Sequence, residues 1–139
     1  MSWQWHGLVL TGLAVAWPGA DVSAQTKPEA ELPDLEVHYL ALSDKGSVIY
    51  QVANRGKVSS GLPFVAEIYI NGVQTDSITH SPLPGLSVQT VESNMARLAD
   101  CKAGKVRLVL DPQNSVQEVS KANNERSVLL TPRCAQAPR

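Results

Sequence analysis

The sequence predicts an all-β fold, a seven-stranded antiparallel β-sandwich of immunoglobulin-like size. Three observations lead to this prediction. From residue 35 onward, apolar and polar residues alternate in short runs. Turn-forming Gly, Pro and Asn residues separate the runs. No stretch has the 3.6-residue period of an amphipathic helix. At 139 residues the chain supports one core with short appendages.

The first three strands are predicted from local patterns. Residues 35–42 (LEVHYLAL) are rich in β-forming side chains. Apolar residues alternate over residues 48–53, and Asn54-Arg55-Gly56 ends that run. The third run, residues 64–70, is followed directly by Asn71-Gly72. That dipeptide favours a tight hairpin, because both central residues of a type I′ turn need a positive φ.

Four further strands follow at short spacing. Residues 73–79 return from the hairpin, and the prolines after His80 end them, because proline cannot donate to a ladder. Strands are then predicted over residues 87–94, 105–110 and 125–130. Because these seven strands fit within about 100 residues, a single thin core between two sheets is expected.

The N-terminal residues have the pattern of a secretory signal peptide. A ten-residue apolar run covers residues 7–16, about half the ~20 residues that a membrane-spanning helix needs. Trp17-Pro18-Gly19 then breaks any helix, and residues 22–24 (VSA) suit a cleavage site. We therefore expect a signal peptide over residues 1–24, a flexible linker over 25–32 and no membrane span after cleavage. The segment has no Lys or Arg before its apolar run, and a buried helix or strand is the alternative.

Composition excludes some partners. The formal net charge is −1, with 12 basic against 13 acidic residues, so nucleic acid is not an expected partner. All three tryptophans lie within residues 1–24. The remaining chain thus offers few aromatic rings for stacking on sugars, and a glycan partner is less favoured than a protein.

Three short motifs mark the chain from residue 32 to residue 130. Pro33-Asp34-Leu35 opens the first strand, and Asn54-Arg55-Gly56 closes the second. Residues 111–118 have the sequence DPQNSVQE, and the segment ends in Asn123-Asn124. With these motifs the chain resembles the CARDB family, a cell-adhesion-related module of bacteria and archaea, whose DPxNxVxE…NN signature is the most specific match. The resemblance implies an immunoglobulin- or fibronectin-III-like sandwich over residues 33–131, with a non-catalytic, extracytoplasmic role. Residues 132–139 are then a tail that carries Cys134.

Two cysteines, Cys101 and Cys134, fit an exported protein. Each lies four residues from a predicted strand, and antiparallel pairing of these strands brings both thiols to the same end of the sandwich. Oxidising conditions after export would favour a disulfide. Two free thiols in a cytosolic chain are the alternative.

The signature loop admits two interpretations. Its oxygen-bearing side chains are Asp111, Asn114, Glu118, Asn123 and Asn124, with Pro112 beside them. Asp111, Asn114 and Glu118 are candidate Ca²⁺ ligands, because this ion prefers oxygen donors. The favoured interpretation is a network of hydrogen bonds that holds the loop without metal. Lys121 supports it, because a cation there would oppose a divalent ion.

The function expected from these observations is an exported, non-enzymatic binding or adhesion module that recognises a protein or another component of the cell envelope. Val65, Glu67 and Tyr69, on one face of the third strand, form its candidate partner face. A Ca²⁺-stabilised structural module is the alternative, with a small hydrolase more remote. No catalytic motif accompanies His38 and His80, and no cofactor is expected.

Overall fold

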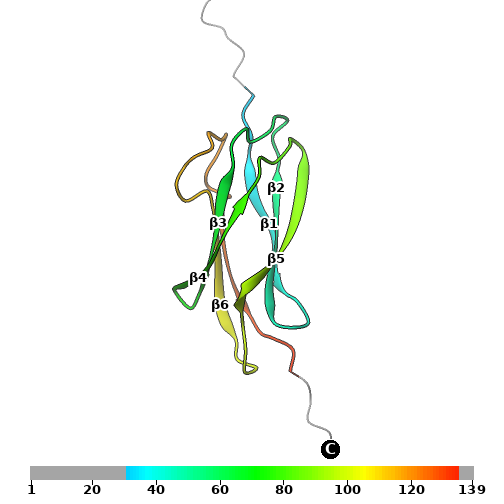
Figure 1. The fold of residues 1–139 in the computed structure, drawn as a ribbon, viewed down its shortest axis with the longest axis vertical. Coiled ribbons are helices and arrows are strands. Elements are labelled where there is room, and N and C mark those ends of the chain that lie inside the picture. The colour runs from blue at the N-terminus through cyan, green and yellow to red at the C-terminus, as the bar shows by residue number, and fades with distance from the viewer. Residues whose placement is uncertain (1–30, 135–139) are drawn as a thin grey trace, which may run out of the picture. The chain divides into compact units, whose positions relative to one another are not determined.

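The computed structural model describes residues 31–134, which form two antiparallel β-sheets packed face to face (Figure 1). The first sheet has the strand order β1-β2-β5, and the second has the order β4-β3-β6-β7. This confirms the predicted all-β sandwich and its seven strands. Their bounds are β1 Leu35–Leu42, β2 Ser47–Asn54, β3 Phe64–Ile70, β4 Val73–His80, β5 Ser87–Arg97, β6 Gly104–Leu110 and β7 Glu125–Leu130.

Alternation along the strands produces the core. In β2, Val48, Tyr50 and Val52 are fully buried, whereas Gln51 between them is half-buried. Successive residues of a strand point to opposite faces, so each strand sends every second side chain inward. Strands β3 and β6 of the facing sheet also bury every second residue. Their buried apolar side chains are Phe64, Ala66, Ile68, Val106, Leu108 and Leu110.

The hairpin between β3 and β4 turns at the predicted dipeptide. Asn71 and Gly72 have φ values of 50° and 84°, the left-handed conformations that a type I′ turn requires. The turn is also tied to β6, because Asn71 N–H donates to Lys105 O and Asn71 Oδ1 accepts from Lys105 N, both at 2.9 Å.

Strand ends differ from the prediction by one residue at both ends of β2, at the end of β4 and at the start of β6, and by three residues at the end of β5. β5 continues past residue 94 to Arg97. Ser93 Oγ accepts hydrogen bonds from Met95 N and Ala96 N, and these bonds direct the chain back toward the core, where Ala96 is buried. His80 lies just outside the predicted strand of residues 73–79, but in the structure it is the last residue of β4, pairs with Phe64 and is only 3% exposed. Its imidazole can be buried there because both ring nitrogens have hydrogen-bond partners.

The two long sides of the sandwich are closed by polar contacts between the sheets. On one side β1 meets β7: Val37 N donates to Asn123 O at 3.1 Å, and Arg126 Nη1 donates to His38 O at 3.3 Å. On the other side the Ser93 hydroxyl of β5 donates to the Asp76 carboxylate of β4.

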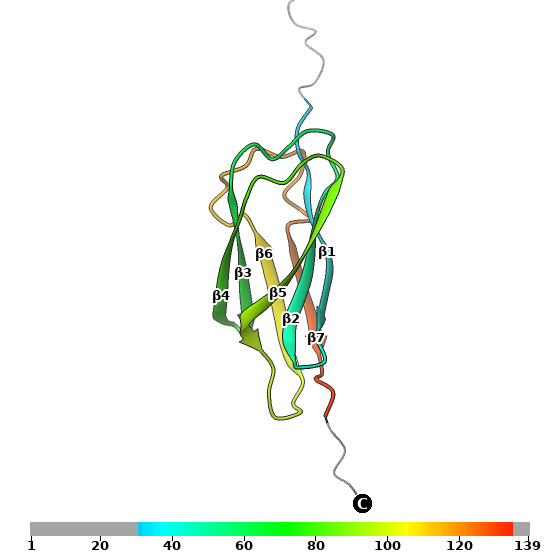
Figure 2. The same cartoon turned by 45° about the vertical axis from the view of Figure 1, so that its right-hand side comes forward.

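The chain between β6 and β7 lies at the pole where β1 begins, and residues 98–103 lie at the opposite pole (Figures 1 and 2). The predicted signal peptide, most of the predicted linker and residues 135–139 lie outside the described residues. Within residues 31–134, we find no helix with the length and apolar character that a membrane span requires.

Candidate functional site

The signature loop leaves β6 at Leu110 through two residues in the left-handed region. Asp111 has φ 49° and Asn114 has φ 57°, a conformation that Asp and Asn tolerate better than other side chains. Asn114 N donates to Asp111 O at 3.0 Å and closes the turn. The Asn114 side chain itself is exposed.

Asp111 organises the first half of the loop through its carboxylate, which is 1% exposed. Its Oδ1 accepts from Ser115 N and its Oδ2 from Val116 N, both at 2.9 Å. The Lys121 ammonium approaches the same Oδ2 to 2.8 Å. Two backbone donors and one ammonium therefore compensate this buried charge, as a buried carboxylate requires.

Glu118 organises the second half and links the loop to β1. Its side chain is fully buried, and its Oε1 accepts from Leu35 N at 2.7 Å. Its Oε2 accepts from Asn124 Nδ2 at 2.6 Å and pairs with Lys121 Nζ at 2.5 Å. The loop is thereby fastened to the first residue of the first strand, 83 positions earlier in the sequence.

The closing asparagines extend this attachment. Asn123 Nδ2 donates to Asp34 Oδ1 at 3.0 Å, and Leu110 N donates to Asn124 O at 2.7 Å. The Oδ1 atoms of both asparagines are buried and have no hydrogen-bond partner in the described structure. The loop thus joins three segments that are far apart in the sequence: the start of β1, the end of β6 and the start of β7.

Of the three predicted Ca²⁺ candidates, the structure brings Asp111 and Glu118 together but not Asn114, whose side chain faces solvent. The ammonium of Lys121 lies between the two carboxylates, where a metal ion would have to bind. Within residues 31–134, no three His, Cys, Asp or Glu side chains lie within reach of one common metal ion. The Asp111 and Glu118 carboxylates therefore form a network of hydrogen bonds and ion pairs centred on the Lys121 ammonium.

The predicted partner face lies on the outer surface of the β4-β3-β6-β7 sheet. Val65, Glu67 and Tyr69 are all half-buried. The Tyr69 hydroxyl donates to Glu67 Oε2 at 2.6 Å, and the Arg107 guanidinium lies 5.0 Å from the centre of the Tyr69 ring. The hydrogen bond to Glu67 raises the pKa of Tyr69. These polar groups satisfy one another, so the face offers few unpaired groups to a partner.

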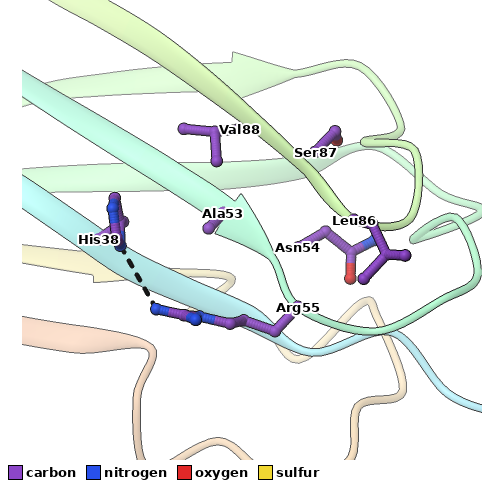
Figure 3. A pocket seen from close by; sticks show the side chains of 7 residues that line it. All are labelled: His38, Ala53, Asn54, Arg55, Leu86, Ser87 and Val88. Carbon is purple, nitrogen blue, oxygen red and sulfur yellow. Dashed lines mark hydrogen bonds between the residues drawn. The ribbon is translucent and has the colours of Figure 1, made fainter.

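A hollow on the other sheet was not predicted from the sequence (Figure 3). Its floor is Ala53 in the middle strand, which is 4% exposed. Val88 and Leu86 form one wall and are 55% and 70% exposed. The remaining lining residues are His38, Asn54, Arg55 and Ser87, with Arg55 Nη2 3.5 Å from His38 Nδ1. In the sequence, only Ala53, a small residue beside bulkier neighbours in β2, could have indicated this hollow. The indication is weak, because alanine also occurs in strands that line no hollow.

The two histidines occupy different environments. His38 is exposed on β1, beside Arg55. His80 is buried: its Nδ1–H donates to Gln89 Oε1 at 3.1 Å, its Nε2 accepts from the Tyr50 hydroxyl at 2.6 Å, and its ring stacks on Phe64 with centroids 5.0 Å apart. Burial lowers the pKa of His80 and raises that of Tyr50. These contacts make His80 a neutral part of the core.

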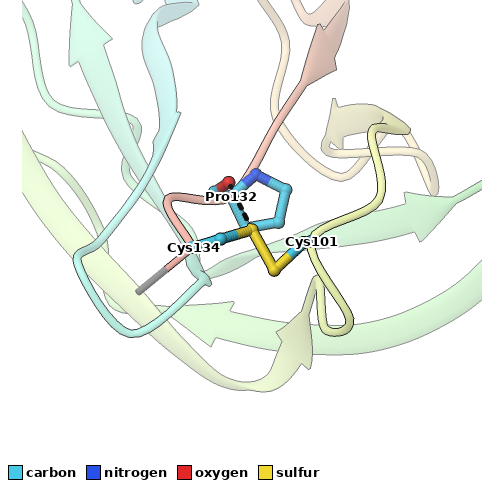
Figure 4. Close-up of a disulfide and its surroundings, with 3 residues drawn as sticks. All are labelled: Cys101, Pro132 and Cys134. Atoms are coloured by element: carbon cyan, nitrogen blue, oxygen red, sulfur yellow. Dashed lines mark hydrogen bonds between the residues drawn. A yellow bond between two sulfur atoms is a disulfide. The ribbon is translucent and has the colours of Figure 1, made fainter. Parts of the chain in front are cut away.

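The structure joins Cys101 and Cys134 by a disulfide, with Cα atoms 5.5 Å apart (Figure 4). Cys101 precedes β6 and Cys134 follows β7, and these two strands pair directly, with Gly104 opposite Leu130. The bridge therefore closes the open end of the β6–β7 hairpin, whose other end is the signature loop.

Comparisons with known proteins agree with this architecture. A domain (residues 272–376) of a candidate cell surface protein from Methanosarcina acetivorans superimposes with a TM-score of 0.64, at 20% identity over 73% of this chain and 93% of that one. The CARDB domain of a Pyrococcus furiosus protein, solved in complex with di-metal ions, gives a TM-score of 0.53 at 22% identity over 73% of this chain and 94% of that one. No curated protein matches the sequence.

The sequence model of the CARDB family matches residues 32–128. This range contains all of β1 to β6 and the whole signature loop from Asp111 to Asn124. The resemblance noted from the sequence is thereby confirmed, and the chain belongs to the CARDB family.

Proposed function

We propose that this CARDB domain is an exported, non-enzymatic binding module that recognises a protein partner through the outer face of its β1-β2-β5 sheet. The observation that carries the proposal is the hollow over Ala53, where Leu86 and Val88 expose most of their apolar surface. Tyr39 is a third exposed apolar side chain on this sheet, at 48%. Adjacent exposed apolar residues rimmed by polar ones are typical of protein interaction sites.

Arg55 narrows the chemistry of the partner. Its guanidinium borders the hollow and is paired with the Glu36 carboxylate. Because the charges of Arg55 and Glu36 are already paired with each other, neither requires an opposite charge from a partner. The proposed partner surface is therefore apolar, with polar, uncharged groups at its rim. Phosphate-rich nucleic acid does not fit such a face, and the chain's net charge of −1 gives it no general attraction either.

One observation, the disulfide, and one prediction from the sequence support export. Disulfides persist mainly in oxidising compartments, and both cysteines of this chain are joined to each other. The expected signal peptide agrees with that compartment. A periplasmic or secreted location follows as part of the proposal.

A non-enzymatic role is supported by the contacts of the two histidines. His80 is enclosed by Tyr50, Phe64 and Gln89, and His38 is near Arg55. Within residues 31–134 neither imidazole bonds to a serine, a threonine or a carboxylate, so neither has the partners of an activated nucleophile. We propose that the domain works without a cofactor.

The test is quantitative affinity capture from the envelope fraction of the source organism, with the exported chain as bait. Val88→Glu places a charge in the hollow and should abolish capture of the specific partner. Val73→Glu is the matched control, because Val73 is a similarly exposed valine, 67%, on the other sheet. A partner retained by Val88→Glu and lost with Tyr69→Ala would overturn the proposed face in favour of the β3 surface.

A further inference from the structure

The signature loop contains a group of oxygen atoms arranged around a positive charge. Lys121 Nζ lies 2.8 Å from Asp111 Oδ2, 2.5 Å from Glu118 Oε2 and 2.8 Å from the main-chain oxygen of Val116. We call these three oxygens the cation cradle. Two carboxylates and a carbonyl are the donors that a hard divalent cation such as Ca²⁺ selects, at distances of about 2.3–2.6 Å.

The cradle does not depend on the lysine for its shape. Backbone N–H groups of Ser115 and Val116 hold the Asp111 carboxylate, and Leu35 N holds Glu118. Both carboxylate side chains are at most 1% exposed, whereas 39% of the Lys121 side chain is exposed. The anionic part is therefore built into the fold, and the cation reaches it from the solvent side.

Charge and access favour exchange of one cation for another. Two carboxylates against one ammonium leave the cradle with a formal charge of −1. A hollow lined by Asp111, Asn114, Lys121 and Asn124 opens beside it. Asn124 supplies an independent sign of unused binding capacity: its residue is 4% exposed, its Nδ2 bonds to Glu118, and its Oδ1 has no partner among residues 31–134.

We infer that Lys121 is a built-in cation that occupies a latent divalent-metal site, and that its ammonium makes the loop of this CARDB domain independent of metal. The ammonium lies within 2.8 Å of all three oxygens of the cradle and therefore excludes a second cation from them.

The inference is tested on the exported chain by thermal unfolding and calorimetric titration, in EDTA and in millimolar CaCl₂. The wild-type chain should unfold at the same temperature in both. Lys121→Ser should unfold several degrees lower in EDTA, recover most of that loss in CaCl₂ and bind one Ca²⁺ per chain, because the vacated cradle then accepts the ion. Lys45→Ser, which removes an exposed lysine from the β1–β2 turn, should change neither property.

A second variant separates the cradle from general effects of calcium. Asp111→Asn combined with Lys121→Ser removes one carboxylate and should lose the calcium response. Calcium stabilisation of the wild-type chain would overturn the inference. So would a Lys121→Ser chain that has the same stability in CaCl₂ and EDTA, or that stays unfolded in both. Each of these results is independent of whether the domain binds its partner through the Ala53 hollow.

Discussion

Asn54 joins separate chain segments through one amide that is 1% exposed. Its Oδ1 accepts from Asp34 N at 3.1 Å and from Gly56 N at 3.0 Å. Its Nδ2 donates to Val58 O at 2.9 Å and to Leu83 O at 3.0 Å. Replacing Asn54 with Ala leaves these backbone groups without partners, so we expect a loss of about 3 kcal/mol in the free energy of unfolding.

Urea denaturation measures this loss. Asn94→Ala is the matched control, because Asn94 is exposed on β5 and its truncation should change stability by less than about 0.5 kcal/mol. If the two variants lost the same free energy of unfolding, the hydrogen bonds of the Asn54 amide would not hold these chain segments together.

His80 gives the stability a defined pH dependence. Burial lowers its pKa in the folded state, so the unfolded chain, with a histidine pKa of about 6.5, takes up the proton first. Stability is therefore complete above the unfolded pKa and falls as the pH drops from there toward the folded pKa. The melting temperature should therefore decrease as the pH falls below about 6.5.

Variants of the two histidines isolate this effect. His80→Phe keeps an aromatic ring against Phe64 and removes the titrating group, so its melting temperature should depend less on pH in this window. His38→Ala removes an exposed histidine and should keep the wild-type pH profile. If the melting temperature of His80→Phe decreased more steeply with falling pH than that of the wild type, His80 would not be the source of the pH dependence.

At the scale of elements, the β3–β4 hairpin depends on a glycine with φ of 84°. A Cβ at Gly72 would meet no atom within 4 Å. Gly72→Ala should therefore lower the free energy of unfolding only by the cost of holding alanine in a left-handed backbone conformation, about 1 kcal/mol. Gly46 has the same φ, but its Cβ would lie 2.5 Å from Leu98 O. Gly46→Ala should therefore lose clearly more stability in urea denaturation. If the two variants were equally stable, steric crowding at the β1–β2 turn would be excluded.

The strands and the hairpin could be predicted because their signals are local. Alternation fixes which residues of β2 point inward, and Asn71-Gly72 specifies its own turn. The contacts of Lys121 and Asn54 could not be predicted in the same way. A lysine three residues after a glutamate and an asparagine two residues before a glycine are both common in solvated loops. Only the packing of the loops against β1 gives Asn54, and the Glu118 that pairs with Lys121, their contacts with distant parts of the chain.

At the scale of the whole molecule, the Cys101–Cys134 disulfide closes a loop with a sequence separation of 33. In the chain-entropy account, a loop of this length stabilises the fold by roughly 3–4 kcal/mol, because the bridge restricts the unfolded chain. Replacing both cysteines with serine should lower the urea midpoint accordingly, as should reductant added to the wild-type chain. The double variant itself should not respond to reductant. An unchanged midpoint after verified reduction would contradict this account.

The disulfide and the cation cradle lie at opposite ends of the same β6–β7 hairpin, and their contacts share no residue. If the sandwich unfolds as one cooperative unit, their contributions should add. We therefore expect the triple variant, Glu118→Gln with both cysteines replaced by serine, to lose the sum of the separate losses within about 0.5 kcal/mol. Urea unfolding of the four chains completes this cycle. A larger loss in the triple variant would mean that, without the disulfide, the hairpin opens separately from the rest of the domain and the cradle becomes the contact that holds it closed.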